Sequence, residues 1–297
     1  MRRLIATLAC TATVGVVTPA LAAPAYAQAP AAKPVTALKK QFVTGRGVHF
    51  TSVSKIDVGG LTSVKLRSKG TVGFGRTGVT ASDITLKADW GDLFGDEEEM
   101  EGLNKPIHTI TVNKTTYSSG HLFDSLLPEG KTWLRSPGGD PAREFSSSFL
   151  INPLDPNTLQ TVLSTTKARG RGGVIGGAKT TLYRGTITVK QLLSASPATR
   201  KQLNGMSAKE KASRISWKVW LGTDNLVRRV TTSTRETVKI KKTSIQMALT
   251  SDARFTGWGK KIKVTPPPAD QVADLSDIDG EAPQTPQLLD LNRGLGR

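Results

Sequence analysis

The sequence predicts an α+β fold built around one large antiparallel sheet. Apolar and charged residues alternate with a period of two over long stretches, and turn sequences join neighbouring stretches as hairpins. The helical interruptions are short and do not recur in a regular βαβ pattern. A sheet with one apolar and one charged face should curl and cover the apolar face with the helices. The 29 glycines and the low aromatic content of 5% agree with many turns.

The first 27 residues have the layout of a secretory signal peptide. Two arginines precede a mainly apolar stretch at residues 4–17, which is too short to span a bilayer comfortably. Two A-x-A triplets follow, ending at Ala22 and Ala27. Cys10, the single cysteine, lies inside the apolar stretch and not at a lipidation position. We therefore expect export into the cell envelope or the medium, cleavage after Ala22 or Ala27, no lipid anchor and no disulfide.

The first half of the exported chain is expected to form mainly strands. An Ala/Pro-rich linker at residues 28–34 precedes a first helix at 35–42. From residue 48 onward the spacing of apolar residues changes to two, which is typical of half-buried strands. The cations that alternate with apolar residues here and later in the chain should share the opposite face of the sheet: Lys65, Arg67, Lys69, Lys87, Arg214 and Lys218.

The second half adds helices and the clearest hairpin. Asp155 before Pro156 is typical of a helix start. A loop rich in Gly and Arg is expected at residues 169–177, and further helices at 190–202 and 207–212. The alternation of Ile215, Trp217, Val219 and Leu221 with polar residues predicts a strand, and Gly222-Thr223-Asp224-Asn225 predicts the turn that follows it. A last strand is expected at 258–264, before three prolines.

The C-terminal segment differs from the rest of the chain. Residues 269–297 contain six acids and two arginines, and we expect a mostly disordered acidic tail. The domain itself would span residues 35–268. Because the whole chain carries 41 Lys+Arg against 24 Asp+Glu, for a net charge of +17, the positive charge is concentrated in that domain.

Several segments carry a family resemblance: Tyr117 with residues 126–133 (LLPEGKTW), residues 220–229 (WLGTDNLVRR), and residues 259–264 (GKKIKV) followed by 267–272 (PPADQV). By their order and spacing, over roughly residues 40–275, they resemble exported actinobacterial proteins similar to the LppX/LprG-type lipid-carrier lipoproteins and the wider LolA/LolB-like fold. The resemblance implies a half-open antiparallel barrel with helices across its concave face. It also implies acyl chains held between sheet and helices, and no catalytic residues.

The sequence contains no recognisable motif for catalysis or cofactor binding. His49, His108 and His121 lie far apart in the sequence, without the spacing of a metal site. No GxSxG is present, and the glycine-rich segment lacks the GK[ST] of a phosphate-binding loop. If that segment binds an anion, Arg169 and Arg171 would be the contacts. The acidic run at residues 96–101 is interpreted as solvated charge. We expect no enzyme, no cofactor, no metal and no nucleic-acid partner.

Three interpretations of function remain open, of which the third, a cell-wall hydrolase, is permitted by export but supported by no motif. The first is a monomeric binding protein for a hydrophobic or acylated small molecule. Its candidate lining comes from the apolar side of the strands: Leu66, Phe74, Ile84, Leu86, Ile187, Trp217, Val219, Ile245 and Met247. The second is a structural or adhesive protein of the cell envelope, which docks on an anionic lipid surface, a wall polymer or a protein partner without holding a ligand. In that case the same nine residues would fill a solid core.

Overall fold

A computed structural model of the chain describes residues 31–60, 62–91, 102, 104–196, 199–200, 206–240 and 243–278. The expected signal peptide, the acidic run at 96–101 and most of the expected acidic tail lie outside these residues. Among the helices that are described, none has the length and apolarity needed to cross a bilayer.

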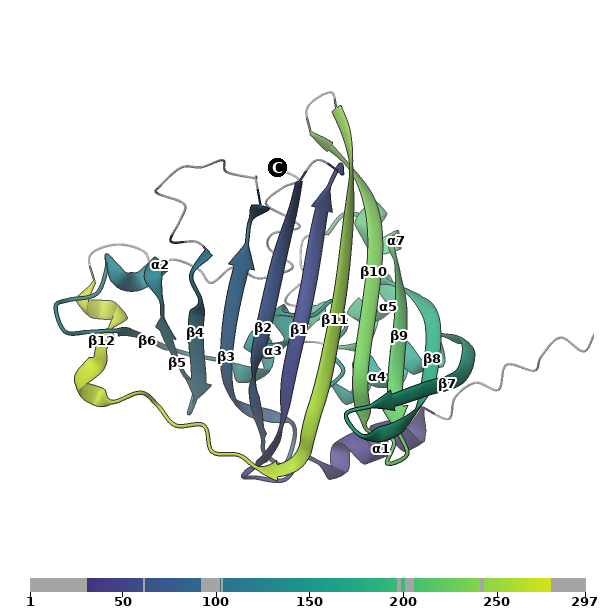
Figure 1. Ribbon diagram of the computed structural model, residues 1–297, viewed down its shortest axis with the longest axis horizontal. Helices are drawn as coiled ribbons and strands as arrows, with labels where there is room; N and C mark the ends of the chain where they lie inside the picture. The colour runs from purple at the N-terminus through teal and green to yellow at the C-terminus, as the bar shows by residue number, and fades with distance from the viewer. Residues whose placement is uncertain are drawn as a thin grey trace, which may run out of the picture.

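One open sheet of 12 strands dominates the structure (Figure 1). Its strands, in chain order, are β1 (Arg46–Val58), β2 (Thr62–Phe74), β3 (Val79–Asp89), β4 (Ile107–Val112), β5 (Thr115–Ser119), β6 (Trp133–Pro137), β7 (Thr166–Ile175), β8 (Ala178–Thr188), β9 (Arg214–Gly222), β10 (Val227–Ile240), β11 (Thr243–Lys261) and β12 (Val272–Asp274). Their order across the sheet is β12-β6-β5-β4-β3-β2-β1-β11-β10-β9-β8-β7. The predicted large antiparallel sheet is confirmed, with one parallel pair, β12 and β6, at an edge.

The first strand of the chain lies in the middle of this sheet, because β1 pairs with both β2 and β11. Strands β1 to β6 extend from it in one direction and β11 to β7 in the other. Strand β11 runs through 19 residues, since β10 pairs with its first part and β1 with its second. The separate last strand expected at 258–264 is therefore mostly the end of β11.

Short helices accompany the sheet, and the described part of the chain gives the bounds of α1 (Ala32–Lys40), α2 (His121–Asp124), α3 (Pro141–Ser147), α4 (Pro156–Ser164), α5 (Val189–Ala195) and α7 (Ala208–Ala212). Helix α1 starts at Ala32, inside the segment expected to be a linker, and has no side-chain cap. Other starts follow the usual capping chemistry. Asp155 accepts a hydrogen bond from the Asn157 amide, and Ser207 forms a reciprocal capping box with Glu210. Helix α5 ends earlier than predicted, and the extended backbone of Ser196 agrees with the restriction that Pro197 imposes on the residue before it.

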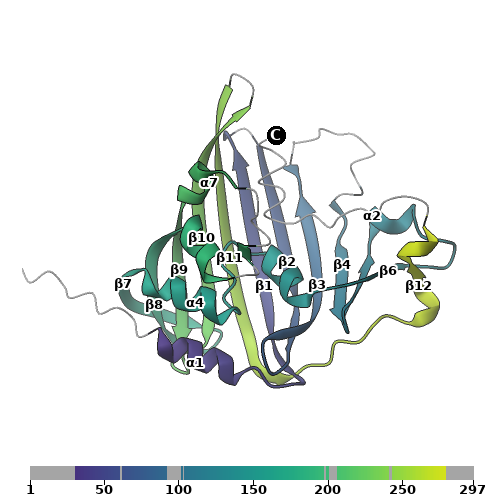
Figure 2. The same ribbon diagram turned by 180° about the vertical axis from the view of Figure 1, so that it is seen from behind.

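Figure 2 shows helices such as α4 in front of one face of the sheet. The main core joins residues of the strands to residues of these helices. Strand residues such as Phe50 and Val219 pack with Leu38 of α1, Phe145 of α3 and Val162 of α4. All five side chains are at most 3% exposed. A smaller cluster forms around Ile56, Val64 and Leu249, and a third around Ile107, Phe123 and Leu134. We call the sheet face that carries these clusters the inner face, and the opposite one the outer face.

Two segments expected to lack regular structure belong to the sheet. The Gly- and Arg-rich segment at 169–177 was expected to be a loop, but most of it forms β7, which pairs with β8. The start of the expected tail forms β12, which pairs with β6. Arg135 of β6 donates hydrogen bonds to both carboxylate oxygens of Asp274, and these bonds lower the pKa of that carboxyl. In both cases an existing strand supplies the backbone partners that local sequence cannot reveal.

Candidate functional site

The outer face of the sheet carries rows of polar side chains. Every second residue of a strand points to this face, and the strand register aligns such residues across the sheet. One row runs over five strands and consists of Arg184, Lys218, Thr231, Asp252 and Val53. The next row consists of Thr186, Ser216, Ser233, Thr250 and Lys55. Hydroxyls and cations therefore lie side by side over β8, β9, β10, β11 and β1.

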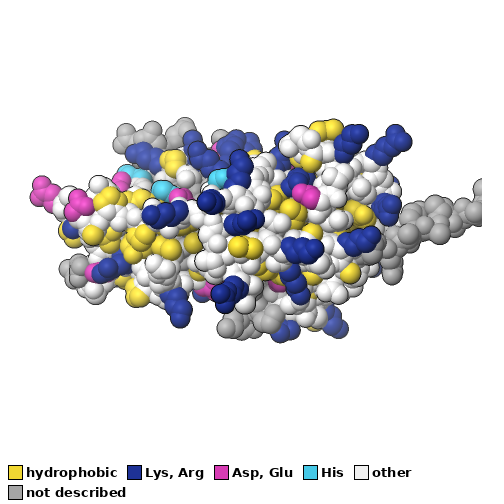
Figure 3. Space-filling view, turned by 90° about the horizontal axis from the view of Figure 1, so that it is seen from below, with side chains coloured by type: hydrophobic (Ala, Val, Ile, Leu, Met, Phe, Trp, Pro, Cys, Tyr) yellow, Lys and Arg dark blue, Asp and Glu magenta, His cyan; other side chains and the backbone are white. Residues whose placement is uncertain are grey.

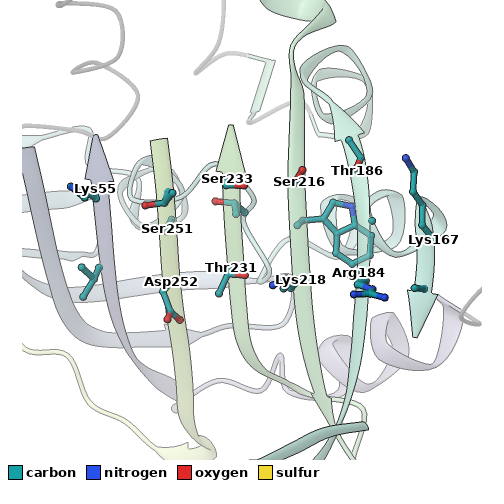
Figure 4. A pocket seen from close by; sticks show the side chains of 16 residues that line it. Lys55, Lys167, Arg184, Thr186, Ser216, Lys218, Thr231, Ser233, Ser251 and Asp252 are labelled. Atoms are coloured by element: carbon teal, nitrogen blue, oxygen red, sulfur yellow. The ribbon is translucent and has the colours of Figure 1, made fainter. Parts of the chain in front are cut away.

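These rows form the floor of a groove with a volume of about 730 Å³. Figure 4 shows the labelled side chains along the groove, from Lys55 on β1 to Arg184 on β8 and Lys167 on β7. Asp252 is the one carboxylate among the residues that line it, against four cations. We call this feature the outer groove.

Strand β7 forms a wall at one end of the outer groove, because the β7–β8 hairpin bends back over the outer face. Trp220 points outward from β9, yet it is only 9% exposed. A Cβ atom on Gly172 would lie 2.8 Å from Cδ1 of Trp220 and 2.4 Å from the Thr180 hydroxyl oxygen. A glycine at position 172 is therefore what allows β7 to approach the indole so closely. At the hairpin tip, Gly176 approaches Thr256 on β11.

Three side chains contact one another at the groove: Trp220, Arg229 and Asp252. The Arg229 guanidinium donates two hydrogen bonds to the Asp252 carboxylate, at 2.8 and 2.5 Å, and lies 4.7 Å from the centroid of the Trp220 ring. These hydrogen bonds raise the pKa of Arg229. Because Asp252 is bound to Arg229 in this bidentate manner, its charge is not free to balance the cations that line the groove.

The groove cations are largely unneutralised. Lys55 lies 3.7 Å from Asp57, a pair in which both side chains are well exposed. For Lys167, Arg184 and Lys218, no ion pair occurs within the described part of the chain. Figure 3, which views another side of the molecule, shows Lys and Arg side chains spread widely and few acidic ones. The local field should favour an anion.

The nine residues predicted to line a ligand site belong to strands whose inner-face positions carry the core. Phe74, Ile84, Ile187, Trp217 and Val219 belong to the main cluster. Leu66 and Met247 belong to the smaller cluster, against which Leu86 packs. Ile245 is partly buried and, with Met247, lines a groove near the β10–β11 turn. The structure thus distributes eight of the nine over two clusters, both contacted by Leu150, and leaves Ile245 outside them.

Small side chains separate these clusters at the centre of the inner face. One row across the sheet reads Trp217, Thr232, Ser251, Ser54, Leu66, and the next reads Val219, Val230, Ala253, Ser52, Ser68, Leu86. We call the five central hydroxyl residues the hydroxyl patch: Ser52, Ser54, Ser68, Thr232 and Ser251. Each is at most 7% exposed, and the buried Thr232 hydroxyl has no hydrogen-bond partner in the described structure. Such an unpartnered group is uncommon in a packed core.

The histidines do not converge on a site. His49 hydrogen-bonds Thr71 at 2.9 Å, His108 hydrogen-bonds Asp83 at 2.7 Å, and His121 hydrogen-bonds Asp124 at 3.2 Å. Within the described ranges, no three His, Cys, Asp or Glu residues gather as metal ligands would.

Among the described ionisable groups, Glu144 is one whose pKa is raised mainly by burial. It lies in the first turn of α3, next to the deeply buried Phe145. Burial raises the pKa of its carboxyl, Asp140 adds to the effect, and Arg143 opposes it. Because the pKa in the folded state exceeds that in the unfolded state, the proton stabilises the fold at low pH. This stabilisation is lost as the pH rises through the folded-state pKa.

Glu144→Gln should therefore raise the melting temperature at pH 7, where the parent must keep a carboxylate in a desolvated position. The difference should shrink as the pH falls below the usual carboxyl pKa of 4.5, because both side chains are then neutral. Thermal unfolding of both proteins between pH 3.5 and 8 tests this. Glu129→Gln, at an exposed position, is the control and should show no such pH-dependent gain. An unchanged melting temperature for Glu144→Gln across this range would contradict the assignment.

The sequence predicted only some of the cations that line the outer groove. Lys218 was predicted to face outward and lines the groove, whereas Arg169 and Arg171 lie on β7 and are not among the lining residues. Arg184 and Lys167 take their place. Arg184 could have been found from its alternation with Ile187 and Gly185, which face the core. No sequence signal pointed to Lys167, since its strand was not predicted.

No family model and no curated protein matches the sequence. Among solved structures, a DUF1329 family protein from Desulfovibrio piger is 14% identical, with 76% of this chain and 91% of that chain covered and a TM-score of 0.23. A LolA superfamily protein from Nitrosomonas europaea is 8% identical, with 80% and 94% covered and a TM-score of 0.25. The Pseudomonas aeruginosa MucA/MucB complex gives 11% identity, 74% and 93% coverage and a TM-score of 0.21. Values this low do not assign the chain to a family.

Proposed function

We propose that this protein is an exported, non-enzymatic carrier that binds a hydrophobic or acylated molecule between the inner face of its sheet and its helices. The observation that carries the proposal is the hydroxyl patch. Small side chains occupy the centre of the inner face, where a packed core would be expected to carry large apolar ones. Trp217, Val219, Leu66 and Leu86 flank the patch and would form the apolar walls of the site.

The helix layer over this face is made of short pieces, which favours ligand entry. None of the described helices exceeds nine residues. Helix α3 contacts β3 and β4, whereas α4 and α5 contact β8 and each other. Helix α3 therefore lies over a different part of the sheet from α4 and α5. If the two groups moved slightly apart, the sheet surface between them would be exposed. The unpartnered Thr232 hydroxyl would then offer a hydrogen bond to a polar group of the ligand.

Burial of an acyl chain supplies enough free energy without any specific polar contact. Each CH₂ group removed from water contributes about 0.8 kcal/mol, or on the order of 12 kcal/mol for a chain of about 16 carbons. Association and ordering of the chain remove a large part of that gain. Micromolar affinity remains within reach, so the absence of a binding motif in the sequence does not argue against a carrier.

The direct test is to extract the purified protein with organic solvent and analyse the extract by mass spectrometry. A carrier should release a lipid in near-stoichiometric amount, or should bind a fluorescent fatty acid when it has been emptied. A protein that carries no lipid and binds no fatty acid would contradict the proposal.

Ser54→Leu should weaken fatty-acid uptake while it leaves the melting temperature nearly unchanged, because leucine would occupy the space intended for the ligand. Val219→Trp is the reference for overpacking, since Val219 is 1% exposed within the main cluster. It should destabilise the fold by about 1–3 kcal/mol. Thr51→Leu, on the same strand but on the outer face, is the control and should leave uptake unchanged. If Ser54→Leu destabilises the fold as much as Val219→Trp does, the hydroxyl patch is solid core.

A further inference from the structure

We infer that the outer groove is a binding site for an extended anionic polymer whose chain carries hydroxyls beside its phosphate or carboxylate groups. Its side chains lie on the opposite face of the sheet from those of the hydroxyl patch, although Thr232 and Ser251 are lining residues of the groove and members of the patch. The inference does not rest on the proposed carrier function. Charge, shape and hydrogen-bonding capacity each support it.

The charge of the groove favours an anionic ligand. Lys55, Lys167, Arg184 and Lys218 line it, and Asp252 is already bound by Arg229. Arg184 and Lys218 are register partners on β8 and β9, so one anionic group can contact both. Arginine adds bidentate geometry that suits phosphate and carboxylate alike.

The spacing of the cations favours a chain over a small ion. Lys55 on β1 and Arg184 on β8 are four strands apart, which is about 19 Å at the usual spacing of neighbouring strands. A single phosphate cannot contact both ends of such a groove. A polymer that lies across the strands can contact Lys55 at one end, and Lys218, Arg184 and Lys167 towards the other.

The groove floor can also bind the uncharged parts of such a chain. Thr186, Ser216, Ser233 and Thr250 form one row beside the cations. None of their hydroxyls takes part in a side-chain hydrogen bond inside the described structure, so each can donate to and accept from a polyol or sugar. A chain rich in hydroxyls complements this row.

Two other polyanionic partners fit less well. A bilayer surface is flat, whereas the tip of the β7–β8 hairpin bends over the outer face towards Thr256 (Figure 1). Lys69 and Lys87 lie on β2 and β3, away from this hairpin, so a membrane would meet them first. Single-stranded nucleic acid is usually held by stacking on aromatic side chains. The one aromatic residue among the lining residues, Trp217, is 2% exposed and packs into the core, where its indole N–H bonds the Thr165 hydroxyl.

The test compares two variants that remove the same charge from the protein. Lys167→Gln with Lys218→Gln changes the groove, whereas Lys69→Gln with Lys87→Gln changes cations on β2 and β3 that do not line it. Affinities would be measured by calorimetry for polygalacturonate, poly(glycerol phosphate), neutral dextran, oligothymidylate and phosphatidylglycerol vesicles. The two charged hydroxyl-rich polymers distinguish a carboxylate from a phosphate ligand.

The parent protein should bind at least one of these two polymers, with an affinity that falls as salt rises, and should not bind dextran. Loss of the groove cations should weaken binding about tenfold for each contact removed and lower the salt slope by about one to two. The β2/β3 variant should stay within about twofold of the parent. Equal weakening by both variants, or tighter binding to oligothymidylate or vesicles, would overturn the proposal.

A second pair of variants tests the shape of the groove without changing its charge. Ser233→Trp places a large side chain on the exposed floor and leaves the net charge unchanged. It should abolish polymer binding, whereas Thr85→Trp, on the same outer face at β3, should not. If both tryptophan variants bind polymer like the parent, binding does not involve the groove and the inference fails.

Discussion

Phe145→Ala should lower the free energy of unfolding by about 3–5 kcal/mol, the usual cost of removing a fully buried phenylalanine. Phe145 has 0% exposure and belongs to helix α3. Its ring centroid lies 5.2 Å from that of Phe50, 4.7 Å from that of Phe149 and 6.4 Å from that of Phe255. One side chain thus connects α3 to β1 and β11, the two strands on which both halves of the sheet are built. Alanine would leave a cavity and remove three aromatic contacts.

Urea unfolding followed by circular dichroism measures this loss. Val174→Ala is the control, because Val174 on β7 is 67% exposed and its truncation should change stability by no more than about 0.5 kcal/mol. A loss below about 1 kcal/mol for Phe145→Ala would mean that α3 is not held against the sheet as described.

Gly185→Val should destabilise the fold by about 2–4 kcal/mol. Gly185 pairs with Trp217, and a Cβ atom at this position would lie 2.6 Å from the Trp217 ring and 2.3 Å from the Thr165 backbone oxygen. The indole also donates a hydrogen bond of 3.0 Å to the Thr165 hydroxyl. A larger side chain must therefore displace the tryptophan. Overpacking costs about 1–3 kcal/mol, and the lost hydrogen bond adds about 1 kcal/mol.

Gly170→Val offers a matched control on the neighbouring strand. A Cβ atom on Gly170 would meet no atom within 4 Å, so valine should be accommodated without strain. Thermal and urea unfolding of both variants would compare them under the same conditions. Equal stability of the two variants would contradict the close packing of Trp217 against Gly185.

Much of the sheet could be predicted from the alternation of side chains. The pattern of Ile215, Trp217, Val219 and Leu221 identified both the strand and its buried side, and all four are at most 2% exposed. The helix start at Asp155 followed from an N-cap residue before proline, and the structure confirms it. These features depend on neighbours within a few residues, which the sequence displays directly.

The candidate sites were predicted only in part, because each depends on residues far apart in the chain. The outward cation Lys218 was correct, but its groove partners Lys167 and Lys55 come from strands whose positions no local pattern reveals. The hydroxyl patch likewise joins Ser54 to Ser251 through the β1–β11 pairing. Ser54 by itself gave no sign that it lies in the centre of a core.

The sequence alone determined most of the segments that form strands, the apolar side of those strands, and the starts of several helices, since these properties follow from spacing and capping within one segment. Only the tertiary structure decided that β1 lies between β2 and β11 and that a Gly- and Arg-rich segment becomes β7. It also decided that β7 packs over Trp220 and borders the outer groove. The reason is physical. Strand pairing and the approach of Gly172 to the indole bring together residues that are distant in the chain, and their free energy exists only after the chain has folded.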